Sequence, residues 1–326
     1  MSTAAQRKER LHRLIDLALA YRRATRSELA EQLRRDRTRL YVDTDNPKLD
    51  LIVGLAEALE WSVDAVVEYI RRGDDEASSG TVDGDFERLD KEAVAAHHAT
   101  DFAKMAEVAK KMYAAATTPQ HRGRACRLEG AAWEGQGRYT QCVTAFRRGL
   151  EVEGLPQSER MALQANLAHA HYCLWDLVPA RGICHVILEH MQAKPPTSRT
   201  DRVTQAFAHY VRGNALRRML VARPENYVET AELAHVDLGM AEALYRQIGV
   251  EFKADYLNAI AQTCRGAIVE VEVELGRRKP AEALDEIVSF VGKRGTMEPA
   301  PQGDELETFG WWCDFGTNIA FRHLQG

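Results

Sequence analysis

The sequence has no apolar run of the ~18 to 20 residues that a membrane-spanning helix needs, and its first residues lack the apolar core of an export signal. Its six cysteines form no CxxC pair, which argues against a disulfide framework or a cysteine-based zinc site. These absences predict a cytoplasmic protein with reduced cysteines.

The common catalytic motifs are also missing, since no HExxH, P-loop or nucleophile elbow occurs. His97 and His98 are adjacent, and His169 and His171 are two residues apart, so neither pair shares a helix face as a metal-binding pair at i and i+4 would. The sequence therefore predicts no catalytic residue, no metal and no cofactor. A deep pocket with a perturbed carboxylate, His or Cys would instead favour an enzyme.

The composition is that of a folded, helical protein. The 326 residues are 45% hydrophobic and 28% charged, and at ~100 to 200 residues per domain they predict at least two domains. Long amphipathic stretches rich in Ala, Leu, Glu and Arg favour an all-α fold. Residues 267–276 alternate Val and Glu as a strand would, but a helical stripe at i, i+3 and i+7 and the helical context favour helix there.

The net charge of −5 conceals two opposed segments. Residues 1–42 contain 11 Lys and Arg against five Asp and Glu, a local net charge of +6, whereas residues 73–92 contain eight acidic against two basic residues, a net of −6. A basic N-terminal segment is typical of contact with nucleic acid.

Gly, Ser and Asp replace the periodic apolar residues over 71–86, which indicates a linker. The predicted organisation is a head at 1–72, an acidic linker at 73–86 and a larger helical domain at 87–326. The linker has two interpretations: an ordinary solvated connection, or a segment that folds back on the basic head and competes with phosphate.

Five short helices are predicted in the head. The first presents Leu11, Leu14 and Ile15 on one face, and the second is SELAEQLRR, with DRTRLY following as a short third element. Pro47 can begin the fourth helix and Ser62 can cap the fifth.

Through SELAEQL and NPKLDLIVGLAEALEWSVDAVV, the head resembles Xre/Cro-type helix-turn-helix domains. That resemblance implies that a third helix enters the DNA major groove. The side chains that it places at the DNA are Arg26, Arg35, Arg37, Thr38, Arg39 and Tyr41. The segment from Leu33 to Pro47 is shorter than is usual in that family, so phosphate contact, base reading and a protein-docking role all stay open.

A repeat of about 37 residues runs through the larger domain. Phe102, Tyr139 and Leu177 are 37 and 38 residues apart, and each lies at a turn between two helical stretches. The small and large residues around Gly130 and Phe146 are spaced as in tetratricopeptide repeats, which this domain resembles. We expect four or five helix pairs and a closing segment that covers the last pair with Trp311, Trp312, Phe315 and Phe321.

In tetratricopeptide repeats, the first helix of each pair lines the inner groove. Alignment on Gly130, Ala168 and Gly213 predicts a basic and aromatic groove suited to an acidic peptide or a C-terminal carboxylate. Its predicted lining is Arg124, Arg127, His169, Tyr172, Tyr210, Asn214 and Arg217. The alternative is that some of these side chains pack between repeats or face solvent.

Head and repeats together resemble the peptide-sensing transcriptional regulators of Gram-positive bacteria. The resemblance implies a homodimer that binds double-stranded DNA through the head and a peptide or protein partner in the groove, with ligand binding shifting the spacing of the two heads. The alternative is a non-enzymatic repeat adaptor in which the head is a protein-interaction or dimerisation unit.

Overall fold

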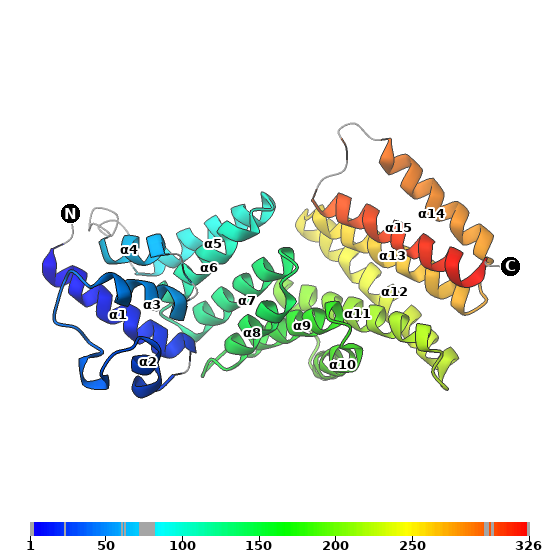
Figure 1. Ribbon diagram of the computed structural model, residues 1–326. Helices are drawn as coiled ribbons and strands as arrows, with labels where there is room; N and C mark the ends of the chain where they lie inside the picture. Colours follow the sequence, from blue (N-terminus) through cyan, green and yellow to red (C-terminus); the bar gives the residue numbers. More distant parts are fainter. Residues whose placement is uncertain are drawn as a thin grey trace.

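The computed structural model describes residues 3–22, 24–59, 61, 63–71, 82–296, 300 and 303–324. Within these ranges the regular structure is helical throughout, as the sequence predicts, and no β-strand occurs. No helix in the same ranges has both the length and the apolarity needed to span a membrane. The molecule is elongated, with the two chain ends at its opposite extremes (Figure 1).

The head contains α-helices and one short 3₁₀ turn. These elements are α1 (Ala4–Arg22), α2 (Arg26–Gln32), η1 (Arg37–Arg39), α3 (Leu49–Leu59) and α4 (Val63–Arg71). The stripe predicted on the first helix faces the core, where Leu11 and Leu14 are fully buried. Thr25 and Glu28 form a capping box that starts α2. Ser62, the predicted cap of the last head helix, lies outside the described residues.

Five helix pairs and a closing helix follow in the described part of the chain, and we call them the repeat body (Figure 1). The pairs are α5 (Val82–His98) with α6 (Phe102–Ala115), α7 (Pro119–Gly135) with α8 (Tyr139–Leu150), α9 (Gln157–Cys173) with α10 (Leu177–Ala193), α11 (Arg199–Met219) with α12 (Tyr227–Phe252), and α13 (Tyr256–Glu274) with α14 (Pro280–Gly295). The closing helix is α15 (Asp304–His323), and a single turn, η3 (Leu220–Ala222), extends α11. Most of the alternating Val–Glu stretch therefore lies in a helix.

The repeat body begins earlier than the sequence predicts. Helix α5 starts at Val82, so the last residues of the expected linker are helical, while residues 72–81 lie outside the described part. Phe86 is buried in one apolar cluster with Leu89 and Met105. Burial of the Phe86 ring stabilises helix at the end of the acidic segment.

The turn inside each of the first three pairs has the same backbone geometry. Thr100, Gly137 and Trp175 have φ angles of 55°, 70° and 63°. At the middle turn, the amide of Arg138 donates to the carbonyl of Trp133 at 2.8 Å, and the other two turns contain the corresponding bond. A left-handed residue of this kind ends a helix and satisfies its last carbonyls. The predicted repeat of about 37 residues therefore matches the spacing of this left-handed turn along the chain.

Glycines let the two helices of a pair approach closely. A Cβ on Gly130 would lie 2.2 Å from the ring of Phe146, and one on Gly213 would lie 2.8 Å from Leu238. Both distances are shorter than a real Cβ contact, so a larger residue at either position would force the helices apart.

The closing helix covers the last pair as expected, with one exception. Trp312 and Phe315 are buried, and Trp312 stacks on Phe290 with ring centroids 4.0 Å apart. Trp311 is partly buried. Phe321, predicted to join this cover, is 65% exposed because it lies on a different face of α15 from Trp312 and Phe315.

Head and repeat body meet at Tyr21, near the end of α1. Its hydroxyl donates to Oε1 of Glu129 on α7 at 2.9 Å, and its ring packs edge-on against Tyr113 of α6. Glu129 also forms an ion pair with Arg148 of α8. All of Tyr21, Glu129 and Arg148 are buried, so the contact between the two units contains charge shielded from water.

Candidate functional sites

The basic segment of the head follows α2 and is held by local hydrogen bonds. The chain turns at Arg34, which has a φ of 51°, and the amide of Arg35 donates to the carbonyl of Ala30 at 2.8 Å. The Asp36 carboxylate then accepts the amide of Thr38 at 2.7 Å and starts η1. The segment 34–39 therefore has a defined backbone.

The third helix implied by the family resemblance is reduced to the single turn η1. Between Arg34 and Tyr41 only Leu40 is buried. This stretch therefore has no apolar stripe whose burial could stabilise a longer helix. The structure corrects the expectation at this point: the head presents no α-helix here that could enter a major groove.

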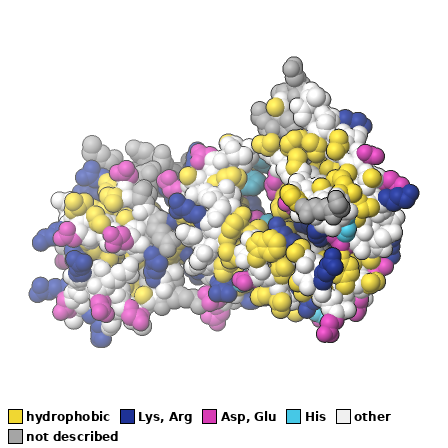
Figure 2. Space-filling view, turned by 45° about the vertical axis from the view of Figure 1, so that its right-hand side comes forward, with side chains coloured by type: hydrophobic (Ala, Val, Ile, Leu, Met, Phe, Trp, Pro, Cys, Tyr) yellow, Lys and Arg dark blue, Asp and Glu magenta, His cyan; other side chains and the backbone are white. Residues whose placement is uncertain are grey.

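The arginines of this segment form no close ion pair with a carboxylate of the described residues, although the charges of Arg37 and Arg39 help to lower the pKa of Asp36 beside them. Elsewhere in the head, Arg7, Lys8 and Arg13 each pair with a carboxylate. Among the described residues no carboxylate lies within ion-pair distance of the segment's arginines, which are Arg34, Arg35, Arg37 and Arg39. Basic and acidic side chains are interspersed over the left end of the molecule in Figure 2. We call these four residues the arginine segment.

The remaining predicted DNA contacts have local partners. The Arg26 guanidinium lies over the ring of Tyr41, 5.2 Å from its centroid, and the Tyr41 hydroxyl donates to Asp16. Thr38 donates its hydroxyl to Asp36 at 2.5 Å. These side chains support the fold of the segment beside the free arginines.

A cavity of about 630 Å³ opens between the first helices of successive repeats, and we call it the N-terminal cavity. It contains Arg124 and Arg127, both predicted for the groove. Its full lining is Phe86, Glu87, Asp90, Lys91, Gln120, His121, Arg124, Arg127, Pro156, Ser158, Glu159, Ser198 and Thr200. Acidic and basic side chains are both present, so the surface is mixed rather than basic as predicted.

Both arginines of the N-terminal cavity are paired through one nitrogen. Nε of Arg124 donates to Asp90 and Nε of Arg127 donates to Glu159, each at 2.8 Å. Burial is the largest of the effects that lower the pKa of Arg127, and the charge of Arg124 acts in the same direction, against Glu159. A guanidinium has five N–H groups, so the terminal nitrogens still offer donors to a ligand.

The structure brings three other predicted groove residues into one aromatic cluster. The His169 ring lies 5.8 Å from Tyr172, 5.2 Å from Phe207 and 6.4 Å from Tyr210, measured between centroids. Tyr172 and Tyr210 are buried, and burial raises the pKa of Tyr210 well above its usual value. The two tyrosines therefore pack between repeats instead of lining an open surface. Of the three, only His169 is partly exposed.

Asn214 and Arg217, also predicted for the groove, are structural. Both are 2% exposed. Nη1 of Arg217 donates to the buried carboxylate of Glu270 at 2.5 Å, and its Nε donates to Asn214. The prediction fails because α13, which contributes Glu270 from 53 residues away, covers this side of α11.

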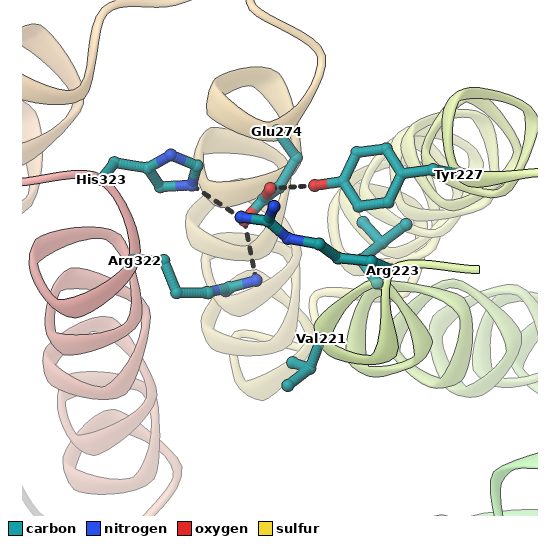
Figure 3. Close-up of a pocket in the computed structure, with 7 residues that line it drawn as sticks. Val221, Arg223, Tyr227, Glu274, Arg322 and His323 are labelled. Carbon is teal, nitrogen blue, oxygen red and sulfur yellow. Dashed lines mark hydrogen bonds and ion pairs between the residues drawn. The ribbon is translucent and has the colours of Figure 1, made fainter. Parts of the chain in front are cut away.

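A second cavity, of about 430 Å³, surrounds Glu274 near the end of α13 (Figure 3). Nη1 of Arg322 lies 2.7 Å and Nε2 of His323 3.0 Å from its carboxylate, and the Tyr227 hydroxyl donates to it. Arg223 lines the same cavity (Figure 3). Burial and the bond to Glu274 raise the pKa of Tyr227 to about 12. The sequence alone does not indicate this cluster, because its members meet only when α13 and α15 pack together.

Glu134, His169 and Cys173 form a third cluster that the sequence analysis missed. Nδ1 of His169 lies 2.6 Å from Oε1 of Glu134, and Nε2 lies 4.0 Å from Sγ of Cys173. Burial lowers the pKa of His169, but Glu134 and Cys173 outweigh it and hold the pKa well above its ordinary value. The signal in the sequence is the spacing of His169 and Cys173 at i and i+4, which places both on one helix face.

No protein-family model matches the sequence, and no curated protein matches it significantly. Among solved structures, the crystal structure of PlcR from Bacillus thuringiensis in complex with the peptide PapR7 and DNA is similar to this chain. The two are 14% identical, the match covers 97% of this chain and 98% of that one, and the TM-score is 0.46.

Proposed function

We propose that the protein is a non-enzymatic, DNA-binding transcriptional regulator whose repeat body binds a peptide or protein partner. The observation that carries the proposal is the arginine segment. Residues 34–39 contain four arginines against one carboxylate, Asp36, and none of the four forms a close ion pair with a described carboxylate. Unpaired arginines on a small head favour a polyanion as the partner.

The head would contact phosphates more than base edges. Proteins normally read the base sequence of DNA with an α-helix or a β-ribbon inserted into a DNA groove. In this head, η1 is only three residues long. Arg35, Arg37 and Arg39 can still make charge-assisted bonds to phosphate oxygens from a turn. Such contacts give affinity that depends strongly on salt and weakly on sequence.

The test is fluorescence anisotropy of the full chain with a labelled mixed-sequence duplex over a series of salt concentrations. Wild-type protein should bind at low salt, with log K falling linearly against log salt concentration. In the double variant Arg37→Ala and Arg39→Ala, the salt slope should fall by about two, at about 0.9 per lost phosphate contact. The control is Arg147→Ala with Arg181→Ala, which removes the same charge from the repeat body.

Absence of binding at low salt would refute DNA binding and favour the adaptor alternative, in which the head docks on another protein. Equal weakening by both double variants would indicate a general charge effect, which also contradicts the role of the arginine segment. Weakening by the head variant on one duplex sequence alone would indicate base reading.

For the peptide partner, the N-terminal cavity is the best-supported site. It lies between consecutive repeats, and its two arginines keep their terminal nitrogens available while Asp90 and Glu159 fix their orientation. A carboxylate, at a C-terminus or on an acidic side chain, matches that donor geometry. Glu87 and Lys91 on the rim would select against highly charged peptides of either sign.

Thermal-shift titration with short peptides, in matched free-acid and amidated forms, tests this site. A free-acid peptide should raise the melting temperature of wild-type protein, and Arg124→Gln with Arg127→Gln should abolish the shift. Arg122→Gln is the control, because Arg122 is exposed on the same helix and does not line the cavity. Retention of the shift in the double variant would exclude this cavity as the site.

The homodimer is the third part of the proposal, and α12 offers a surface for it. Leu233, Val236 and Met240 are exposed on this 26-residue helix at spacings of three and four residues, as in a helix–helix seam. A second copy of the chain is a suitable partner, because a two-fold axis would place the same apolar row of both copies face to face. Light scattering on a size-exclusion column tests it: Met240→Glu should yield monomer, whereas Val186→Glu on exposed α10 should not.

A further inference from the structure

The cluster of Glu134, His169 and Cys173 joins the first helices of two neighbouring repeats. His169 and Cys173 lie one turn apart on α9, so their side chains project from the same face, and Glu134 comes from the last turn of α7. One donor atom from each residue can be chosen so that all three lie within 4.8 Å of one another. A single ion could contact all three once the imidazole turns so that one of its nitrogens faces both Glu134 and Cys173.

An ordinary ion pair does not account for the whole cluster. Nδ1 of His169 is buried and close to Glu134, yet it makes no hydrogen bond in acceptable geometry. On its other side the imidazole faces the thiol of Cys173 rather than a hydrogen-bond acceptor of ordinary strength. A buried ring nitrogen left in this state normally has another partner.

The three donors differ in chemistry, and this combination restricts the metal. Mg²⁺ and Ca²⁺ require sets of oxygen ligands, whereas a thiolate, an imidazole and a carboxylate together suit Zn²⁺. We propose that Glu134, His169 and Cys173 bind one zinc ion, with the fourth tetrahedral position open to water. Three protein ligands with an open position are a common zinc arrangement.

Zinc at this place would fix α7 against α9. Phe207 packs against His169 from α11, so the ligand ring is also buttressed by the next repeat. The ion would therefore stiffen the middle of the repeat body. This proposal is independent of the proposed function, since it requires neither DNA nor peptide.

Cobalt titration of the reduced, metal-stripped full-length chain tests the site. Co²⁺ should produce the thiolate-to-cobalt charge-transfer absorption and saturate at one ion per chain, and Zn²⁺ should abolish that absorption by displacement. Zinc should also raise the melting temperature of the wild-type protein, because a ligand that binds only the folded state stabilises it. Working near pH 8 limits competition from protons.

Variants assign the absorption to this cluster. Cys173→Ser should remove the charge-transfer band, and Glu134→Gln should weaken cobalt binding by about tenfold or more. Cys313→Ser is the matched control, since Cys173 and Cys313 are the two cysteines that are not buried. Circular dichroism shows that each variant is folded before titration.

The proposal is overturned by either of two results. One is a wild-type chain that shows no charge-transfer band with excess Co²⁺. The other is a band that persists in folded Cys173→Ser or disappears in Cys313→Ser, because the thiolate ligand would then be elsewhere.

Discussion

The guanidinium of Arg148 lies over the ring of Tyr21, 3.9 Å from its centroid, and so links the second repeat to the last turn of the head's first helix. Glu129 closes the contact, because it pairs with Arg148 and accepts the Tyr21 hydroxyl. A change in the packing of α7 against α8 would therefore move the end of α1. Under the proposed function, this contact is a route by which binding in the body could bias the head.

Tyr21→Phe should weaken the head–body contact while keeping the ring that Arg148 covers. The variant loses one buried hydrogen bond to a charged acceptor, which costs about 1.5 to 3 kcal/mol. We expect a lower melting temperature in calorimetry and faster hydrogen exchange at the end of α1. Tyr41→Phe is the control, because Tyr41 bonds to Asp16 within the head. Unchanged exchange in α1 would show that the contact does not hold the head.

Arg217→Ala should destabilise the fold instead of altering a groove. The substitution leaves Glu270, which is 1% exposed, with Arg322 as its remaining charged partner. Removal of one member of a buried pair costs about 3 to 5 kcal/mol. Arg277→Ala breaks an exposed pair with Glu232 and should cost about 1 kcal/mol or less. Denaturant unfolding measures both, and similar small losses would contradict the structural role of Arg217.

The repeat architecture was predictable from the sequence because its causes are local. The left-handed turn recurs at Thr100, Gly137 and Trp175, and Gly130 must be small because Phe146 lies against it. Both constraints act within about one repeat, so they leave a period in the sequence.

The sites were only partly predictable because they depend on contacts between distant segments. Helical register places Asn214 and Arg217 with Tyr210, but only the packing of α13 decides that they are buried. In the head, the charges of the arginine segment were visible, whereas its 3₁₀ geometry follows from the lack of apolar residues around Leu40.

Asp237→Asn should lower the stability of the fold at neutral pH, and the loss of stability should be smaller in acid. Burial opposes ionisation of Asp237, but hydrogen bonds from His209 and Arg212 outweigh it and lower its pKa. An Asp whose pKa is lower in the folded state stabilises the fold above its unfolded pKa of about 3.9, and this contribution is lost as pH falls through the folded pKa.

Melting curves from about pH 7 down to about pH 3 test that sign. The difference in melting temperature between wild type and Asp237→Asn should be largest near neutrality and shrink below about pH 4. The exposed Asp285→Asn should give a small, flat difference. A gap that widens in acid would mean that the pKa of Asp237 is raised, not lowered.

The shared turn predicts opposite effects of two substitutions. Thr100 is a β-branched residue at a φ of 55°, a conformation that costs non-glycine residues roughly 1 to 2 kcal/mol. Thr100→Gly should therefore raise the melting temperature, offset in part by the greater freedom of glycine in the unfolded chain. Gly137→Ala should lower it through backbone strain alone, since an added Cβ meets nothing within 4 Å. Calorimetry measures both, and shifts of the same sign would show that left-handed strain does not govern these turns.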